Sequence, residues 1–212
     1  MELKLRENTL DLFVIKEQKG YKTVFNNHQG GPVLDVGGNI GAFEIEFYPW
    51  YSDTQFFAFE PEPENFEILK YHTSEMENVQ CFQNAVAKEE GPIDFYVNSL
   101  KNKGTHTLRP TRGREKITVS GTPFRDVLAN IEPEIIKMDI EGGEWFLMEE
   151  LMNLPSYVRA IAIELHLNAG HYRTNEAVEL HASLIKRFPH CSKGCVYKPE
   201  SKNWTITTIC HS

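Results

Sequence analysis

The sequence lacks long apolar runs, an excess of basic residues and a dense set of cysteines. Its longest stretch without Asp, Glu, Lys or Arg covers only residues 23–34, whereas a membrane-spanning helix needs about 20 apolar residues. Lysines and arginines number 22 against 30 aspartates and glutamates, a net charge of −8. Proteins that bind nucleic acid generally carry the opposite sign, and anionic membranes are disfavoured for the same reason. The composition therefore predicts neither a membrane protein nor a general nucleic-acid binder.

Cysteine is scarce, with four residues in a chain of 212, which is too few for a disulfide scaffold. Residues 1–13 mix acidic and basic side chains and lack the apolar segment of a signal peptide. We therefore expect a cytoplasmic protein. We also expect Cys191, Cys195 and Cys210 to be reduced structural thiols, with a zinc site or a disulfide as alternatives.

What the sequence does contain is ordinary for a soluble globular protein: 41% hydrophobic and 25% charged residues. The length suits one core better than two. Residues 1–31 are mixed and polar, and the apolar pattern sharpens only after them. We expect an N-terminal extension over residues 1–31 and a single domain over residues 32–212.

Apolar strand-like runs alternate with helical patterns along most of the chain, which is typical of a parallel sheet built from βαβ units. The pattern predicts strands over 32–37, 55–59, 79–82, 135–139 and 160–165, and helices over 42–47, 65–73, 124–130, 144–151 and 175–188. Residues 93–97 and 117–119 predict a hairpin-like insert. Two late strands near residues 195–197 and 204–209 predict an antiparallel hairpin at the edge of the sheet.

A glycine loop follows the first predicted strand and precedes a helix. Its spacing is D-x-G-x-x-x-G, formed by Asp35, Gly37 and Gly41, with Gly38 and Asn39 between them. A dinucleotide site would instead have G-x-G-x-x-G, and the charge of Asp35 suits a cationic ligand better than a pyrophosphate. The loop therefore favours S-adenosylmethionine, with an ordinary glycine turn as the alternative.

An acidic residue, Glu60, ends the second predicted strand. A carboxylate in this place can accept hydrogen bonds from both ribose hydroxyls of a bound nucleoside. Because NAD and S-adenosylmethionine both carry a ribose, Glu60 does not separate them. The alternative is an exposed acid before a proline turn.

Four sequence blocks, in order, resemble the FkbM-type methyltransferases. The loop DVGGNIG resembles that family's D-V-G-A-N-I-G, and residues 58–66 resemble its A-F-E-P-x-P-x-N-F. Residues 136–144 resemble its I-K-I-D-V-E-G-A-E, and residues 163–166 its I-E-x-H. The resemblance covers roughly residues 32–168, although residues 122–128 depart from the family's T-L-D-D-F-L segment.

The resemblance implies a Rossmann-like class I methyltransferase fold: an α/β domain whose mostly parallel sheet has helices on both faces. It implies S-adenosylmethionine as cofactor and a hydroxyl acceptor on a small molecule or sugar. Asp35, Gly37, Gly38, Asn39 and Gly41 would shape the methionine pocket. Glu60 would hold the ribose, and Asn84 and Ala85 would lie beside the adenine.

Polar residues follow the predicted strands over 135–139 and 160–165, where ligands of open α/β sheets bind. We expect the catalytic residues to be Asp139, Glu164 and His166, with Asp139 or His166 as the base that deprotonates the acceptor. Glu141 is expected to contact the substrate. We expect no bound metal. The alternative is a Mg²⁺ site formed by Asp139, Glu141 and Glu164.

Basic residues gather in an insert at about residues 98–116, which carries six lysines and arginines against one acid. Arg109 and Arg112 would bind a phosphorylated or carboxylated substrate. The alternatives are a solvated loop or a face for RNA. If the insert binds RNA, the protein would be an RNA or nucleotide methyltransferase. A further alternative to the O-methyltransferase is a nucleotide-binding module without catalysis.

Overall fold

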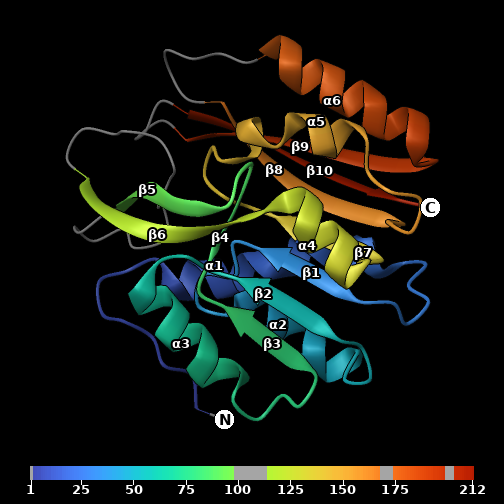
Figure 1. The fold of residues 1–212 in the computed structure, drawn as a ribbon. Coiled ribbons are helices and arrows are strands. Elements are labelled where there is room, and N and C mark those ends of the chain that lie inside the picture. The colour runs from blue at the N-terminus through green and yellow to red at the C-terminus, as the bar shows by residue number, and fades with distance from the viewer. Residues whose placement is uncertain (1, 98–113, 168–173, 199–202) are drawn as a thin grey trace.

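The computed structural model describes residues 2–97, 114–167, 174–198 and 203–212. Within them the larger sheet has seven strands in the order β3-β2-β1-β7-β8-β10-β9 (Figure 1). Its strands are β1 (Val33–Val36), β2 (Phe56–Phe59), β3 (Val79–Phe82), β7 (Ile135–Met138), β8 (Ala160–Leu167), β9 (His190–Lys198) and β10 (Asn203–His211). The first five are parallel, and β10 runs antiparallel to both β8 and β9. The expected Rossmann-like fold with an antiparallel C-terminal pair is confirmed.

Alternate residues of the central strands face two separate hydrophobic layers. Leu34 and Ile136 belong to one layer, which contains α4 (Phe124–Ile131), α5 (Met148–Met152) and α6 (Thr174–Arg187). Val33 and Ile135 belong to the other, beside α2 (Ala42–Phe47). Strands buried on both faces have near-continuous apolar sequences, which is why the sequence pattern located them well.

A smaller sheet follows the third strand of the larger one. Its strands are β4 (Ala85–Ala87), β5 (Gly91–Val97) and β6 (Glu115–Pro123), in the order β4-β6-β5. The antiparallel β5–β6 pair confirms the expected hairpin, whereas β4 was not predicted. Most of the basic insert, including Arg109 and Arg112, lies outside the described residues.

The remaining helical segments are η1 (Gln18–Phe25), η2 (Tyr48–Trp50), α1 (Asp11–Glu17), α3 (Pro63–Thr73) and η3 (Glu144–Phe146). The single helix predicted over residues 144–151 is wrong, because η3 and α5 are separated by Leu147. Trp145 and Leu147 are both buried, and residues two apart do not share one face of an α-helix.

The N-terminal segment, residues 2–31, packs against the sheet. Tyr21, Val24 and Phe25 are each at most 4% exposed and share a hydrophobic cluster with Phe43 and Phe47 of α2. Phe25 stacks on Tyr51 with ring centroids 4.3 Å apart and at an interplanar angle of 14°. The segment therefore contributes to the core.

Cys191 and Cys210 form a disulfide bond, so the expectation that they are reduced thiols is wrong. The two residues are direct partners in the antiparallel β9–β10 register, with Cα atoms 4.1 Å apart. Cross-strand neighbours bring their side chains close, and this pairing could not be read from spacing alone. Cys81 carries a free thiol.

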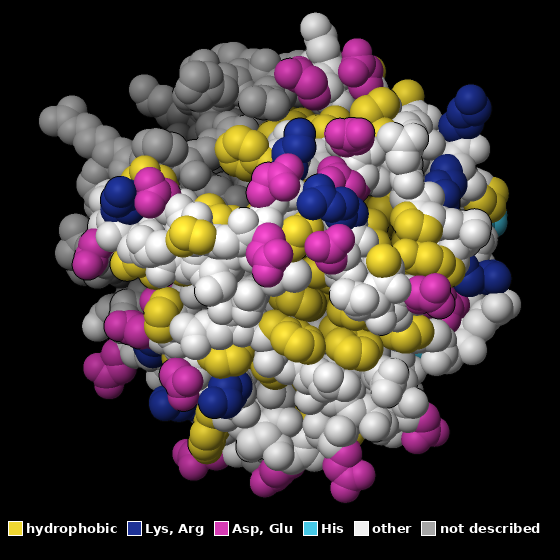
Figure 2. Space-filling model, in the orientation of Figure 1, with side chains coloured by type: hydrophobic (Ala, Val, Ile, Leu, Met, Phe, Trp, Pro, Cys, Tyr) yellow, Lys and Arg dark blue, Asp and Glu magenta, His cyan; other side chains and the backbone are white. Residues whose placement is uncertain are grey.

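None of the described helices has the length and apolar character needed to cross a membrane. On the face seen in Figure 2, acidic and basic side chains intermingle with hydrophobic ones.

Candidate active site

The glycine loop turns the chain sharply from β1 into α2. Gly37 has a φ of +88°, and a Cβ there would lie 2.0 Å from the carbonyl oxygen of Asp139, so only glycine fits. The backbone N–H groups of Gly37 and Gly38 both donate to the carbonyl oxygen of Phe59, at 3.0 Å. Asn39 also has a positive φ, +50°. The loop is thus held at the carboxyl ends of β1 and β2.

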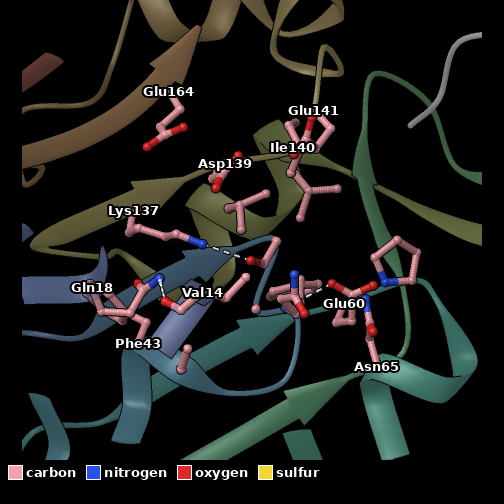
Figure 3. Close-up of a pocket in the computed structure, with 18 of the residues that line it drawn as sticks. Val14, Gln18, Phe43, Glu60, Asn65, Lys137, Asp139, Ile140, Glu141 and Glu164 are labelled. Atoms are coloured by element: carbon pink, nitrogen blue, oxygen red, sulfur yellow. Dashed lines mark hydrogen bonds between the residues drawn. The ribbon is translucent and has the colours of Figure 1, made fainter. Parts of the chain in front are cut away.

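An open cavity lies over this loop, and the empty space within it and at its mouth, open solvent included, is about 1020 Å³. Gly37, Gly38 and Asn39 line it on one side. Figure 3 shows Glu60 and Asn65 at one end and Asp139, Glu141 and Glu164 at the other. Its apolar wall is formed by Phe59, Pro61, Ala85, Val86, Phe95 and Ile140. Apolar pockets with a few convergent polar groups are the usual form of small-molecule sites.

Glu60 is fixed at the end of β2 by two backbone donors. Its Oε2 accepts from the N–H of Asn39 at 2.9 Å, and its Oε1 accepts from the N–H of Glu62 at 2.8 Å. The residue is only 5% exposed. Burial raises the pKa of Glu60 to about 7, against the opposing effect of these two hydrogen bonds. Glu60 therefore changes charge near neutral pH.

Asp35 lies beneath the loop, outside the residues that line the cavity. Lys137 of β7 pairs with its Oδ1 at 3.0 Å and donates to the carbonyl oxygen of Gly37 at 2.7 Å. Burial raises the pKa of Asp35, and Lys137 opposes that shift. Asp35 thus acts on the loop through Lys137, a residue that sequence reasoning did not assign a role.

The acidic end of the cavity is built by two neighbouring parallel strands. Asp139 and Glu141 follow β7, and Glu164 lies on β8. The side chains of Asp139 and Glu141 are each 23% exposed. Glu141 has a φ of +52°, an uncommon conformation for a residue other than glycine. Such conformations often occur where function needs a side chain in a particular place.

His166 lies behind these carboxylates and is 5% exposed, so it does not line the cavity. Its Nε2 is 3.4 Å from Glu141 Oε2 and 3.8 Å from Asp139 Oδ1, and its Nδ1 is 3.3 Å from Glu144 Oε1. Burial alone would lower the pKa of His166, but Glu141, Glu144 and Asp139 outweigh burial and raise it well above the usual range.

The N-terminal segment supplies part of the site, which sequence reasoning missed. Phe13, Val14 and Gln18 line the cavity, as do Leu10 and Glu17. The hydroxyl of Tyr21 donates to Glu164 Oε1 at 2.8 Å. No local pattern in residues 1–31 indicates which surface they cover, so this contact depends on tertiary packing alone.

The predicted site residues fall into three groups. Lining the cavity are Gly37, Gly38, Asn39, Glu60, Ala85, Asp139, Glu141 and Glu164. Near it but outside its lining are Asp35, Gly41, Asn84 and His166, with Asn84 donating to the Thr122 hydroxyl at 3.1 Å. Arg109 and Arg112 lie outside the described residues. Arg114 is described: burial lowers its pKa, and the charge of Glu141 opposes that shift.

Comparison with known proteins supports the resemblance seen in the motifs. A family model for the methyltransferase FkbM domain matches residues 35–198. Hexuronic acid methyltransferase AglP of Haloferax volcanii is 26% identical over 133 residues, which cover 62% of this chain and 54% of AglP. Methyltransferase sdnD of Sordaria araneosa is 24% identical over a match that covers 61% of this chain and 67% of sdnD. The match therefore spans about half to two thirds of these relatives.

Solved structures show the same fold at low identity. Precorrin-6y C5,15-methyltransferase from Geobacter metallireducens superposes with a TM-score of 0.53 at 14% identity, covering 93% of this chain and 88% of its own. M. jannaschii TYW2, solved in complex with AdoMet, superposes with a TM-score of 0.52 at 11% identity. The match covers 99% of this chain and 77% of the TYW2 chain. At such identities the likeness concerns the fold alone.

Proposed function

Because the chain belongs to the FkbM methyltransferase family, we propose that it transfers the methyl group of S-adenosylmethionine to a hydroxyl group of a small molecule or sugar. The observation that carries the proposal is the cavity itself. It joins an apolar wall and the Glu60 carboxylate at one end to a cluster of carboxylates at the other.

The residues present suit the cofactor. The Glu60 carboxylate has each oxygen already oriented by one backbone N–H, and further lone pairs remain for ribose hydroxyls. Ala85, Val86 and Phe95 offer an apolar surface for the adenine. Gly37, Gly38 and Asn39 bring backbone close to the cavity beside Asp139, where the methionine end would lie.

S-adenosylmethionine supplies a methyl group on a positively charged sulfur; the C–O bond forms as the C–S bond breaks, and the acceptor loses its hydroxyl proton. The protein's main contribution is therefore alignment. The acceptor's proton must go to a nearby base, and Asp139 and Glu141 are the carboxylates that reach the cavity beside Glu164. His166 is buried behind them and acts through them.

The acceptor class follows from the acidic end of the cavity. A molecule with several hydroxyl groups can donate one hydrogen bond from each of them to a different carboxylate, which suits a sugar or another polyhydroxylated small molecule. AglP, by its name, methylates a hexuronic acid, and this also supports a sugar acceptor.

The direct test is methyl transfer from S-adenosylmethionine with a labelled methyl group. Purified protein would be offered neutral sugars, hexuronic acids and a short RNA in parallel. We expect label in a sugar product. The Glu60→Ala variant should lose at least tenfold in cofactor affinity, because each hydrogen bond to a charged group contributes about 1.5–3 kcal/mol. The exposed Glu67→Ala, on the outside of α3, is the matched control. Label in RNA alone would contradict the proposed acceptor.

A further inference from the structure

Three side chains at the acidic end of the cavity have the arrangement of a metal-ligand set. Asp139, Glu164 and His166 each offer one ligand atom, and these atoms lie within 4.8 Å of one another. Ligands of small divalent cations lie about 2.0–2.2 Å from the ion, so two of them are about 3–4 Å apart. Side-chain rotations that bring the atoms roughly 1 Å closer would complete the set.

The buried environment of His166 determines which of its nitrogens faces this set. Glu144 is fully buried, and its Oε2 accepts from the N–H of Gly142 at 2.8 Å. Its Oε1 accepts from the backbone N–H of His166 at 2.6 Å and lies 3.3 Å from His166 Nδ1. Because Glu144 is an acceptor, Nδ1 carries the proton. Nε2, on the other side of the ring, faces Asp139 and Glu141.

Two atoms of the set are buried and form no hydrogen bond within the part of the chain that the structure describes. They are His166 Nε2 and Asp139 Oδ1, which lie 3.8 Å apart. If Nε2 carries no proton, its lone pair faces carboxylate oxygens and the two repel, and buried polar atoms usually have partners. Either a proton or a cation must lie between them.

Two basic side chains of the described part of the chain interact with groups outside the proposed ligand set. Lys137 pairs with Asp35 at 3.0 Å and donates to Gly37. The positive charge of Arg114 interacts with the negative charge of Glu141.

We propose that Asp139, Glu164 and His166 bind a divalent cation of the Mn²⁺ type, which holds the acceptor hydroxyl in the methyltransferase reaction proposed above. The ligand set combines two carboxylates, which suit Mg²⁺ and Mn²⁺, with an imidazole, which suits transition metals. Mn²⁺ is the ion that both preferences share. The Mg²⁺ site considered from the sequence had Glu141 as its third ligand. In the site proposed here, His166 takes that place.

Residues around the three ligands orient them as a metal site requires. Metal-binding histidines usually donate their other ring N–H to a carboxylate, and Glu144 occupies that position for His166. Glu164 Oε1 accepts from Tyr21 at 2.8 Å and from Thr207 at 3.4 Å. Tyr21 and Glu144 are therefore positioning residues of this site.

A cation would also resolve a difficulty in the proton transfer. Unperturbed carboxylates have a pKa of about 4, whereas water, the nearest simple model for a hydroxyl group, has a pKa of 15.7. A metal ion lowers the pKa of a bound hydroxyl group and orients it. The proton could then pass to Glu141, which lines the cavity and is outside the proposed ligand set.

The test is binding of Mn²⁺ to EDTA-treated, dialysed protein, followed by electron paramagnetic resonance of the free ion. We expect one saturable site. His166→Gln and Asp139→Asn should each weaken it at least tenfold, and Glu144→Gln by about 10–100-fold, as for other residues that orient metal ligands. Asp126→Asn, an exposed carboxylate on α4, should bind Mn²⁺ like the wild type.

Titration of the same samples with S-adenosylhomocysteine in EDTA separates the two proposals and checks folding. Unchanged S-adenosylhomocysteine affinity with weakened Mn²⁺ binding in the variants supports the metal site. Absence of saturable Mn²⁺ binding, or binding that survives His166→Gln and Asp139→Asn together, overturns it and leaves a proton between His166 and Asp139. Full methyl transfer in EDTA also overturns it while upholding the proposed function. Mn²⁺ binding without any S-adenosylhomocysteine binding supports the metal site and refutes the proposed function.

Discussion

At the scale of single residues, the pair formed by Lys137 and Asp35 is the buried electrostatic contact beneath the glycine loop. The two side chains are 5% and 1% exposed. Burial alone would lower the pKa of Lys137, but Asp35 and Asp139 outweigh burial and raise it. The pair also explains why a lysine is tolerated in a strand whose other residues are apolar.

Removing one partner of this pair should destabilise the fold. Lys137→Met leaves the Asp35 carboxylate buried without its cation, which costs about 3–5 kcal/mol. Adding Asp35→Asn removes that charge and should restore part of the loss. The free energy of unfolding in urea measures both. Lys116→Met, which breaks the exposed pair with Asp94, should change it by less than about 1 kcal/mol. Purely additive effects of the two buried substitutions would show that the pair is not coupled.

The buried Glu60 carboxylate predicts a pH dependence of cofactor binding. Its pKa of about 7 in the free protein should fall when ribose hydroxyls donate to the charged form. Affinity for S-adenosylhomocysteine should therefore be highest above pH 7 and weaken as the pH falls toward 6, by up to about tenfold per pH unit. Calorimetry between pH 6 and 8 measures it. Glu60→Gln should lack this component, whereas an identical profile in that variant would exclude Glu60 as its source.

At the scale of elements, α1 forms one wall of the cavity although the family match begins only at residue 35. Phe13 lines the cavity and is 55% exposed, while its neighbour Leu12 is 51% exposed and does not line it. Leu12 is therefore a matched control for Phe13, because the two are similarly exposed and only Phe13 lines the cavity.

Phe13→Ala should raise the KM for the acceptor or cofactor by about tenfold, because burying a large apolar side chain against a ligand contributes roughly 1.5–3 kcal/mol. Leu12→Ala should leave KM unchanged. Steady-state kinetics with one substrate varied at a time would measure both variants. If the KM values of Phe13→Ala and Leu12→Ala both equal that of the wild type, α1 does not contact the bound molecules.

Much of the element order could be predicted from the sequence, for physical reasons. Strands β1, β2 and β7 are short, mostly apolar runs, and each is followed directly by a glycine or an acid. β4 escaped prediction because three residues, Ala85–Ala87, give no periodicity. That Glu60 and Asp139 follow the carboxyl ends of strands, with Glu164 on the strand beside Asp139, was expected from the general geometry of parallel sheets.

The rest of the site depends on contacts between distant residues. Glu144 and His166 are 22 positions apart, and Tyr21 and Glu164 are 143 apart. Nothing in their local sequence pairs them. The same holds for the role of Lys137, whose side chain reaches Asp35 only because β1 and β7 are neighbours in the sheet.

At the scale of the whole molecule, the disulfide joins the last two strands across a sequence separation of 19 residues. In the chain-entropy description, closing a loop of about 15 residues stabilises the folded state by about 3 kcal/mol. Reduction should lower the free energy of unfolding by a similar amount.

Urea unfolding with and without a thiol reductant measures this effect. The Cys191→Ala, Cys210→Ala double variant should be insensitive to reductant. Cys81 should not contribute, because burial raises the pKa of its thiol to about 11 and the thiolate is the reactive form. Equal stability of the wild type in both conditions would contradict the stabilising role.

The central claim is that the cavity over the glycine loop binds S-adenosylmethionine for methyl transfer. The most direct measurement is calorimetric titration of the purified protein with S-adenosylhomocysteine, with NAD in a parallel cell and Gly37→Ala as the variant whose Cβ would collide with Asp139. We predict one-to-one micromolar binding of S-adenosylhomocysteine to the wild type, its loss in Gly37→Ala, and no binding of NAD. Binding of NAD in place of S-adenosylhomocysteine would contradict the assignment and make Glu60 part of a dinucleotide site.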